Sequence, residues 1–217
     1  MIPKIIHLIW MQGVSGLPTQ YLGYCQSWER KHLKWDVKMW SKETLPTLQN
    51  AWVLDIDNPV IQADVARFEL VKQFGGVYVD CDMFCLQSLD SLIAKYDAFI
   101  SKRSRDMLAS SSFGATPEHP WLVDLVNEIE ASKDKLITPG EIRGPIERAT
   151  RRHPNVTRLP YTVLEAGQAQ PGAYATHHKS GAWRNDFQKL VETPAKRPKD
   201  KLKRTNKWRG SERGQTR

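Results

Sequence analysis

The sequence predicts an α/β domain in which helices pack on a mainly parallel sheet. Short apolar stretches typical of buried strands alternate with stretches of helical periodicity. The strongest helical stretch also leads through a glycine pair straight into a very short apolar strand. At 217 residues the chain is long enough for one domain with its own core. We expect this domain to span residues 1–193 and a basic, disordered tail to span residues 194–217.

The first half of the chain contains four predicted elements. Residues 4–10 (KIIHLIW) are β-branched and apolar, which predicts a buried strand. Apolar side chains at helical spacing predict a helix over residues 19–31, and alternation predicts a second strand over residues 35–40. Pro59 begins a helix that runs to residue 74, where Gly75-Gly76 stops it.

Shorter signals follow in the second half. Residues 77–79 form the apolar strand after the glycine pair, and residues 120–129 have the spacing of an amphipathic helix. Gly144-Pro145 begins a shorter helix, and residues 174–178 have the pattern of a late strand.

The positive charge of the chain is concentrated at its end. The net charge is +8, and residues 194–217 alone contain ten basic and two acidic residues. The remaining 193 residues are therefore net neutral, so we expect no specific nucleic-acid binding by the domain. The tail suits non-specific contact with anions, and we expect it to solubilise the chain or to contact an anionic membrane surface, where Trp208 would suit the interface.

Other features of the sequence indicate the cellular compartment. The sequence contains no run of ~18 apolar residues and no signal-peptide pattern, so we expect no transmembrane helix and no secretion. Three cysteines do not suit a disulfide framework and fit a reducing compartment. We therefore expect a cytoplasmic protein that is peripheral at a membrane.

Asp80-Cys81-Asp82 is the sharpest chemical feature. It follows a buried strand, and in an extended chain its two carboxylates point to the same side. Carboxylates at the carboxyl end of a strand face the usual ligand crevice of an α/β sheet and suit Mg²⁺ or Mn²⁺. An isolated pair of this kind is more often two solvated turn residues. Cys81, between them, points away and is expected to be a buried filler rather than a zinc ligand with Cys85.

The surrounding sequence is more specific. The stretches ADVARFEL (63–70) and FGGVYVDCD (74–82) resemble the signature of glycosyltransferase family 32. This family of DXD-motif sugar transferases includes capsular-polysaccharide and α-1,6-mannosyltransferase enzymes and relatives of the large clostridial toxin catalytic domains. IPKIIHLIW (2–10), Gly144-Pro145 and HHKSGAW (177–183) look like further motifs of the family, in the same order.

The resemblance implies a GT-A fold, with a Rossmann-like, mainly parallel sheet flanked by helices, and a retaining, metal-dependent sugar transfer. The donor would be a UDP- or GDP-sugar, the cofactor Mn²⁺ or Mg²⁺, and the acceptor a glycan, a lipid-linked sugar or another hydroxyl. It implies catalytic roles for Asp80, Asp82 and Arg67, and metal ligation by Asp82, Asp80 and His177. The residues implied to contact the donor are Trp10, Ile9, Asp64, Arg67, Tyr78, Asp80, Ser180 and Trp183.

Several of these site residues have a second possible interpretation. Trp10 either stacks on the nucleobase or fills the core. Asp64 and Arg67 share a helical face, so they either hold the donor sugar or form a surface ion pair. Only one of His177 and His178 can face the metal if both lie in a strand, and we expect it to be His177. Glu69 and Glu165 are carboxylates that no spacing assigns, so no nucleophile is predicted.

Two other functions compete with sugar transfer. A phosphoryl-transfer enzyme would use Asp80 and Asp82 with two metals, but it would need more converging acids and a basic groove. A non-catalytic nucleotide-sugar or carbohydrate-binding protein would not need Asp64, Arg67, Asp80 and Asp82 together. We expect residues 83–115, with Arg103, Arg105 and Ser110-Ser111-Ser112, to form a loop on the acceptor side.

Overall fold

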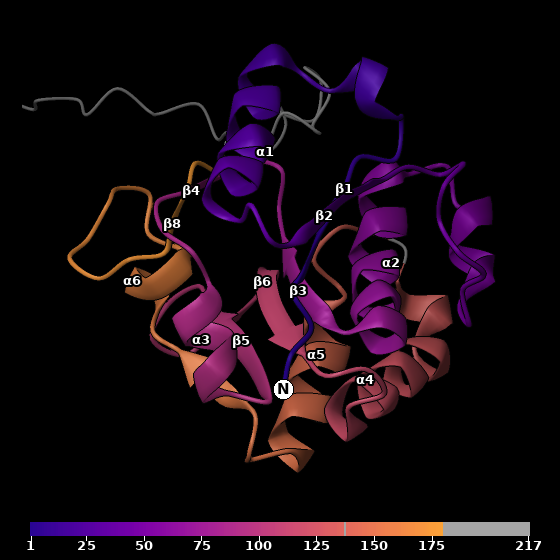
Figure 1. Ribbon diagram of the computed structural model, residues 1–217. Coiled ribbons are helices and arrows are strands. Elements are labelled where there is room, and N and C mark those ends of the chain that lie inside the picture. Colours follow the sequence, from indigo (N-terminus) through magenta and orange to yellow (C-terminus); the bar gives the residue numbers. More distant parts are fainter. Residues whose placement is uncertain (137, 180–217) are drawn as a thin grey trace, which may run out of the picture. The chain divides into compact units, whose positions relative to one another are not determined.

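A six-stranded sheet forms the centre of the computed structural model, which describes residues 1–136 and 138–179 (Figure 1). The strand order is β2-β1-β3-β6-β5-β7. Only β6 runs against its neighbours; the other pairs are parallel, so the predicted mainly parallel sheet is confirmed. The strands are β1 (Ile5–Ile9), β2 (Asp36–Trp40), β3 (Gly76–Val79), β5 (Ala98–Lys102), β6 (Leu108–Ala115) and β7 (Thr157–Leu159).

A second, two-stranded sheet pairs β4 (Met83–Cys85) with β8 (Ala175–His177) in antiparallel register. The chain passes from β3 through residues 80–82 into β4, so the turn that contains the two aspartates connects the two sheets. The pairing brings residues about 90 positions apart side by side, with Met83 opposite His177.

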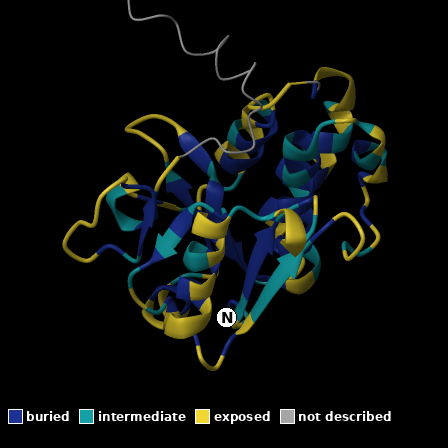
Figure 2. Cartoon of the chain, turned by 90° about the horizontal axis from the view of Figure 1, so that it is seen from above, coloured by how far each residue is buried: buried dark blue, intermediate teal, exposed yellow. Residues whose placement is uncertain are grey.

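Helices cover both faces of the central sheet (Figure 1). On one face lie α2, α4 and α5, and on the other lie α1, α3 and α6 with the small sheet. The central strands are largely buried, and exposed residues gather on the outer helices and loops (Figure 2). The helices are α1 (Thr19–Lys31), α2 (Pro59–Phe74), α3 (Asp90–Lys95), α4 (Pro120–Ala131), α5 (Arg143–Arg152) and α6 (Tyr161–Leu164), with 3₁₀ turns at Val14–Gly16, Ala51–Asp55 and Lys133–Lys135.

The alternation of side chains along the strands divides the core into two clusters. Ile6 and Leu8 of β1 pack with α1 and the small sheet, whereas Ile9 packs with α2 and α4. In β3, Val77 and Tyr78 likewise belong to opposite clusters. Both faces are thus apolar, as expected for a sheet that helices cover on each side.

Helix α2 has the predicted bounds and local reasons for both. The Asn58 side chain accepts a hydrogen bond from the Val60 N–H at 3.0 Å, and Pro59 occupies the first turn, where its missing N–H costs nothing. The helix ends at Gly75, which has φ = 64°. Its polar residues Asp64 and Arg67 are buried, so α2 is covered on nearly all sides.

The prediction that residues 83–115 form a loop is wrong. They contain β4, α3 and the antiparallel hairpin β5–β6, whose tip is the exposed segment 103–107. Serine and alanine give β6 little apolar signal, yet Ser112 is fully buried with its hydroxyl hydrogen-bonded. Arg103 and Arg105 lie in the hairpin tip.

The other predicted elements are confirmed to within a few residues, among them α1, α4, α5 and the late strand β8. Within the described residues, no helix is both long and apolar enough to cross a bilayer. The predicted domain boundary at residue 193 and the predicted disordered tail lie outside the described residues.

Candidate metal and donor site

The two aspartates lie in a tight turn at the carboxyl end of β3. The Met83 N–H donates to the Asp80 carbonyl oxygen at 3.1 Å, which closes a β-turn over residues 80–83. Residues 80–82 therefore form a turn and are not extended. Their carboxylates converge because the chain reverses here, while Cys81 points into the core, with its Sγ 3.3 Å from the Ile9 carbonyl oxygen.

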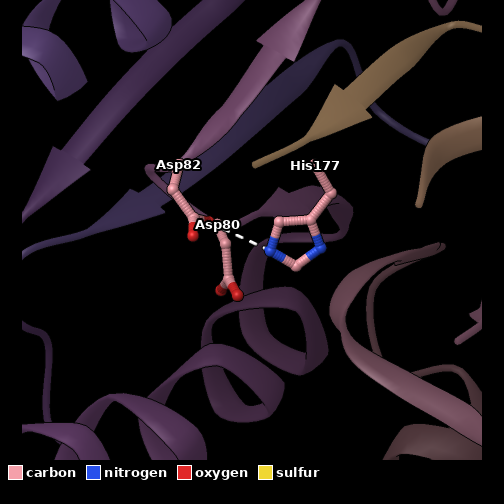
Figure 3. A group of neighbouring side chains, drawn as sticks. All are labelled: Asp80, Asp82 and His177. Atoms are coloured by element: carbon pink, nitrogen blue, oxygen red, sulfur yellow. Dashed lines mark ion pairs between the residues drawn. The ribbon is translucent and has the colours of Figure 1, made fainter. Parts of the chain in front are cut away.

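Asp80, Asp82 and His177 converge on one point (Figure 3). Each offers a ligand atom, and these atoms lie within 4.8 Å of one another. His177 Nε2 is 3.1 Å from Asp82 Oδ1. Two carboxylates with one imidazole are a donor set that suits a hard or borderline divalent cation such as Mn²⁺, so these residues fit the implied metal.

The structure distinguishes the two histidines. His177 is buried and faces the aspartates, and its backbone N–H is held by the Ala166 carbonyl oxygen at 2.9 Å. His178 turns away and stacks on Tyr24 with ring centroids 4.5 Å apart. Of the pair, His177 is thus the one placed to ligate a metal.

Arg67 connects the other predicted site residues. Its guanidinium bonds Asp64 Oδ1 at 2.8 Å and Asp80 Oδ1 at 3.1 Å, and it also donates to the carbonyl oxygens of Ala63 and Ser110. Arg67 and Asp64 are 6% and 8% exposed. The alternative of a surface ion pair is therefore wrong: α2 presents a buried pair to the aspartate turn.

Tyr78 reaches the site through Asp80. It is buried, and its hydroxyl donates to Asp80 Oδ1 at 2.8 Å, while the Arg67 guanidinium lies 4.7 Å from its ring centroid. One carboxylate oxygen of Asp80 thus accepts hydrogen bonds from both Arg67 and Tyr78. The direct donor contact expected of Tyr78 remains a prediction.

The charged groups of the site favour the binding of a cation. Burial raises the pKa of Asp80 and raises that of Asp64 to about 6, in each case against the pull of Arg67. Burial opposes the charge on His177, but the hydrogen bonds that its ring donates to Asp82 and Glu165 raise its pKa to about 10. The site contains four carboxylates and two cationic groups, so its net charge is negative and attracts a divalent cation. The carboxylates are those of Asp64, Asp80, Asp82 and Glu165, and the cationic groups are those of Arg67 and His177.

Glu165 is a site residue that sequence reasoning left unassigned. Its Oε2 accepts a hydrogen bond from His177 Nδ1 at 2.7 Å, and it is 1% exposed. Nothing local in the sequence marks it, because the contact forms only when the segment after α6 packs beside β8. Glu69 lies elsewhere: it accepts hydrogen bonds from the backbone N–H groups of Gln49 and Asn50.

Trp10 and Ile9 end β1 beside the aspartate turn. The Trp10 ring is partly buried and packs edge-on against Tyr21, with centroids 5.8 Å apart. Its Nε1 is buried without a hydrogen-bond partner among the described residues. Ile9 is buried in the core, so a donor contact would come from its backbone. Ser180 and Trp183 lie outside the described residues.

Comparison with known proteins agrees with this geometry. Residues 18–99 match the family model of the glycosyltransferase sugar-binding region containing a DXD motif. The matched stretch runs from α1 to β5 and includes Asp64, Arg67, Asp80 and Asp82.

Curated relatives are similar to this chain over somewhat less than two thirds of its length. The chain is 27% identical to mannosyl phosphorylinositol ceramide synthase CSH1 of Saccharomyces cerevisiae, over 64% of this chain and 38% of that protein. It is 24% identical to inositol phosphoceramide mannosyltransferase 1 of Schizosaccharomyces pombe, over 63% of this chain and 46% of that protein. The chain thus spans less than half the length of these two relatives.

A solved structure shares the fold. A glycosyltransferase involved in the glycosylation of the major capsid of PBCV-1 superposes with a TM-score of 0.50 at 11% identity, covering 82% of this chain and 95% of that one. With the mainly parallel sheet and its flanking helices, this likeness confirms the GT-A fold class.

Proposed function

We propose that this chain, whose residues 18–99 match the family model of the glycosyltransferase sugar-binding region containing a DXD motif, transfers a sugar from a nucleotide-diphosphate donor to a hydroxyl acceptor. The observation that carries the proposal is the convergence of Asp80, Asp82 and His177 at the carboxyl ends of the strands. Arg67 and Tyr78 hold one oxygen of Asp80, which leaves the other oxygen directed to ligand.

The three convergent residues would hold Mn²⁺ or Mg²⁺. Such a cation supplies Lewis-acid stabilisation of the negative charge that grows on the leaving diphosphate. Asp80 and Asp82 provide the charge that attracts it, and Arg67 fixes the direction of Asp80. Asp64, paired with Arg67 on the same face of α2, would accept a hydrogen bond from a donor-sugar hydroxyl.

We propose that the transfer retains the anomeric configuration without a covalent enzyme intermediate. The two carboxylates that the sequence left unassigned, Glu69 and Glu165, are each 1% exposed and hydrogen-bonded to the protein. Neither is placed to attack a sugar. Attack by the acceptor on the face that the diphosphate leaves needs no such group. Nuclear magnetic resonance of the first-formed product would show the opposite anomer if the proposal is wrong.

For the sugar and the acceptor, we propose mannose and a glycolipid. One curated relative is named inositol phosphoceramide mannosyltransferase 1 and the other mannosyl phosphorylinositol ceramide synthase CSH1, and they are similar to this chain over 63% and 64% of its length. A lipid acceptor also agrees with our proposal that the basic segment 194–217 brings a cytoplasmic enzyme to an anionic membrane surface.

Donor hydrolysis tests the proposed function. Purified full-length protein with Mn²⁺ is offered UDP- and GDP-linked sugars, and release of nucleotide diphosphate is followed. We expect one donor to be cleaved, with a loss of at least about 100-fold in Asp82→Asn and in chelator, because a ligand to the leaving-group cation is removed. Asp124→Asn, which changes a partly exposed carboxylate on α4 that pairs with Arg152, is the matched control and should retain full activity.

Failure of every donor to be turned over or bound in calorimetric titration would overturn the proposal. A two-metal phosphoryl-transfer site is less well supported, because the convergent metal-binding group found among the described residues has only two carboxylates and one histidine.

A further inference from the structure

Glu165 anchors a buried hydrogen-bond network behind the candidate metal site. Its Oε1 accepts hydrogen bonds from the hydroxyls of Ser111 at 2.7 Å and Ser112 at 2.6 Å, and its Oε2 accepts one from His177 Nδ1 at 2.7 Å. Ser112 Oγ also lies 2.7 Å from Ser101 Oγ. All five side chains are buried, so the network is shielded from water.

The network joins elements that are distant in the sequence. Ser111 and Ser112 belong to β6, Ser101 to β5, and His177 to β8, while Glu165 follows α6. It therefore connects the antiparallel hairpin of the central sheet with the small sheet that carries His177.

A carboxylate in this place controls which ring nitrogen of His177 is available. Ionised glutamate only accepts hydrogen bonds, so the proton of a neutral His177 ring stays on Nδ1. The lone pair is then on Nε2, which faces Asp82 Oδ1 at 3.1 Å. Hydrogen bonds to a ligating histidine are known to fix its tautomer and ring orientation and to raise its basicity.

We propose that Glu165, held by Ser111 and Ser112, is the positioning residue that orients His177 for metal ligation. The inference rests on the proposed function, because it concerns the same metal. Burial of an ionised carboxylate is costly unless hydrogen bonds compensate, and three donors converge on Glu165. All three donors are side chains, and none is a backbone N–H group of a helix cap or a turn.

Glu69 provides a matched comparison within the same molecule. It is also 1% exposed, and it accepts hydrogen bonds from the Asn50 backbone N–H at 2.7 Å and side-chain amide at 2.9 Å. Its partners fix the segment before the 3₁₀ turn Ala51–Asp55 and include none of the convergent residues. Loss of its charge should reduce stability without reaching the metal.

The test measures Mn²⁺ affinity of the full-length chain by electron paramagnetic resonance of the free ion, with the wild type and all variants compared at the same pH. We expect Glu165→Gln to weaken Mn²⁺ binding about 10- to 100-fold. Glu69→Gln should leave the affinity within about twofold of the wild type while it lowers the melting temperature. His177→Ala should lose more affinity than Glu165→Gln, because it removes the ligand itself.

The outcomes separate this inference from the proposed function. Equal Mn²⁺ binding by the wild type and Glu165→Gln, with loss in His177→Ala, would overturn the role of Glu165 and leave the metal site intact. Absence of Mn²⁺ binding by the wild type would overturn both. If Glu165→Gln does not fold, Glu165→Asp keeps the charge but draws it back by one methylene. A wild-type affinity in that variant would also contradict the inference.

Discussion

Two buried histidines show how neighbours decide the charge of one side chain. His7 is fully buried between the Trp40 indole N–H at 3.1 Å and the Gly75 carbonyl oxygen at 2.8 Å, so it donates one hydrogen bond and accepts the other. Burial is the main reason that its pKa falls to about 4. His177 is also buried, but it lies between the carboxylates of Asp82 and Glu165, and its pKa rises to about 10.

The neutral state of His7 predicts acid-sensitive stability. Its pKa is about 6.5 in the unfolded chain and about 4 in the folded one, so the unfolded chain binds the additional proton between these values. The contribution of neutral His7 to the free energy of unfolding is fully present above pH 6.5. It is lost as the pH falls toward 4, by about 3 kcal/mol in total.

Denaturant unfolding of the wild type and His7→Gln over this pH range measures the effect. Glutamine can accept from Trp40 and donate to Gly75 without titrating. The difference in free energy of unfolding between the wild type and His7→Gln should become smaller, or change sign, as the pH falls. Parallel pH curves would show that His7 does not titrate differently in the two states.

At the scale of elements, local signals predicted the helices better than the hairpin. The spacing in α1 and α2, the cap at Asn58 and the stop at Gly75 are all written in neighbouring residues, so their bounds are predictable. Strand β6 is not, because its serines become suitable for a core only when Ser101 and Glu165 satisfy their hydroxyls. Those partners come from other elements, and no local pattern contains them.

The junction between α2 and β3 depends on glycine. Gly76 has φ = 96°, and a Cβ there would lie 2.6 Å from the Ile5 carbonyl oxygen in β1. Gly76→Ala therefore combines a strained backbone with a clash against a central strand, and we expect a loss of at least about 2 kcal/mol. Thermal unfolding measures it.

Gly23→Ala is the matched control for this substitution. Gly23 lies within α1, and a Cβ there meets nothing within 4 Å. Alanine is the better helix former, so this variant should gain about 0.5–1 kcal/mol. A stable Gly76→Ala protein would show that β1 and β3 can move apart at this point without cost.

At the scale of the whole molecule, the site is assembled from distant segments. Asp80 and Asp82 were predictable because they are two positions apart and follow a strand, and Arg67 because it lies in the preceding stretch that resembles the same family signature. His177 was predictable as one of two candidates, and its selection needed the pairing of β4 with β8. Glu165 was not predictable, since it acts only through His177.

The net charge of the chain is also distributed unevenly along the sequence. Residues 1–193 are net neutral, and residues 194–217 contain the whole net charge of +8, with Trp208 between two basic residues. A net-neutral segment has no general attraction for an anionic surface, so we expect any such attraction to come from the last 24 residues.

We therefore expect the full chain to co-sediment with anionic vesicles and not with neutral ones. Each basic residue close to the surface contributes about 1 kcal/mol, so engagement of only four would favour binding roughly a thousandfold. Replacing the ten basic residues of 194–217 by glutamine keeps the length and should abolish the binding. Raising the salt concentration should weaken the wild type, because the attraction is screened. Donor hydrolysis in solution should be unchanged in the glutamine variant. Undiminished vesicle binding by that variant would place the membrane contact in the domain instead.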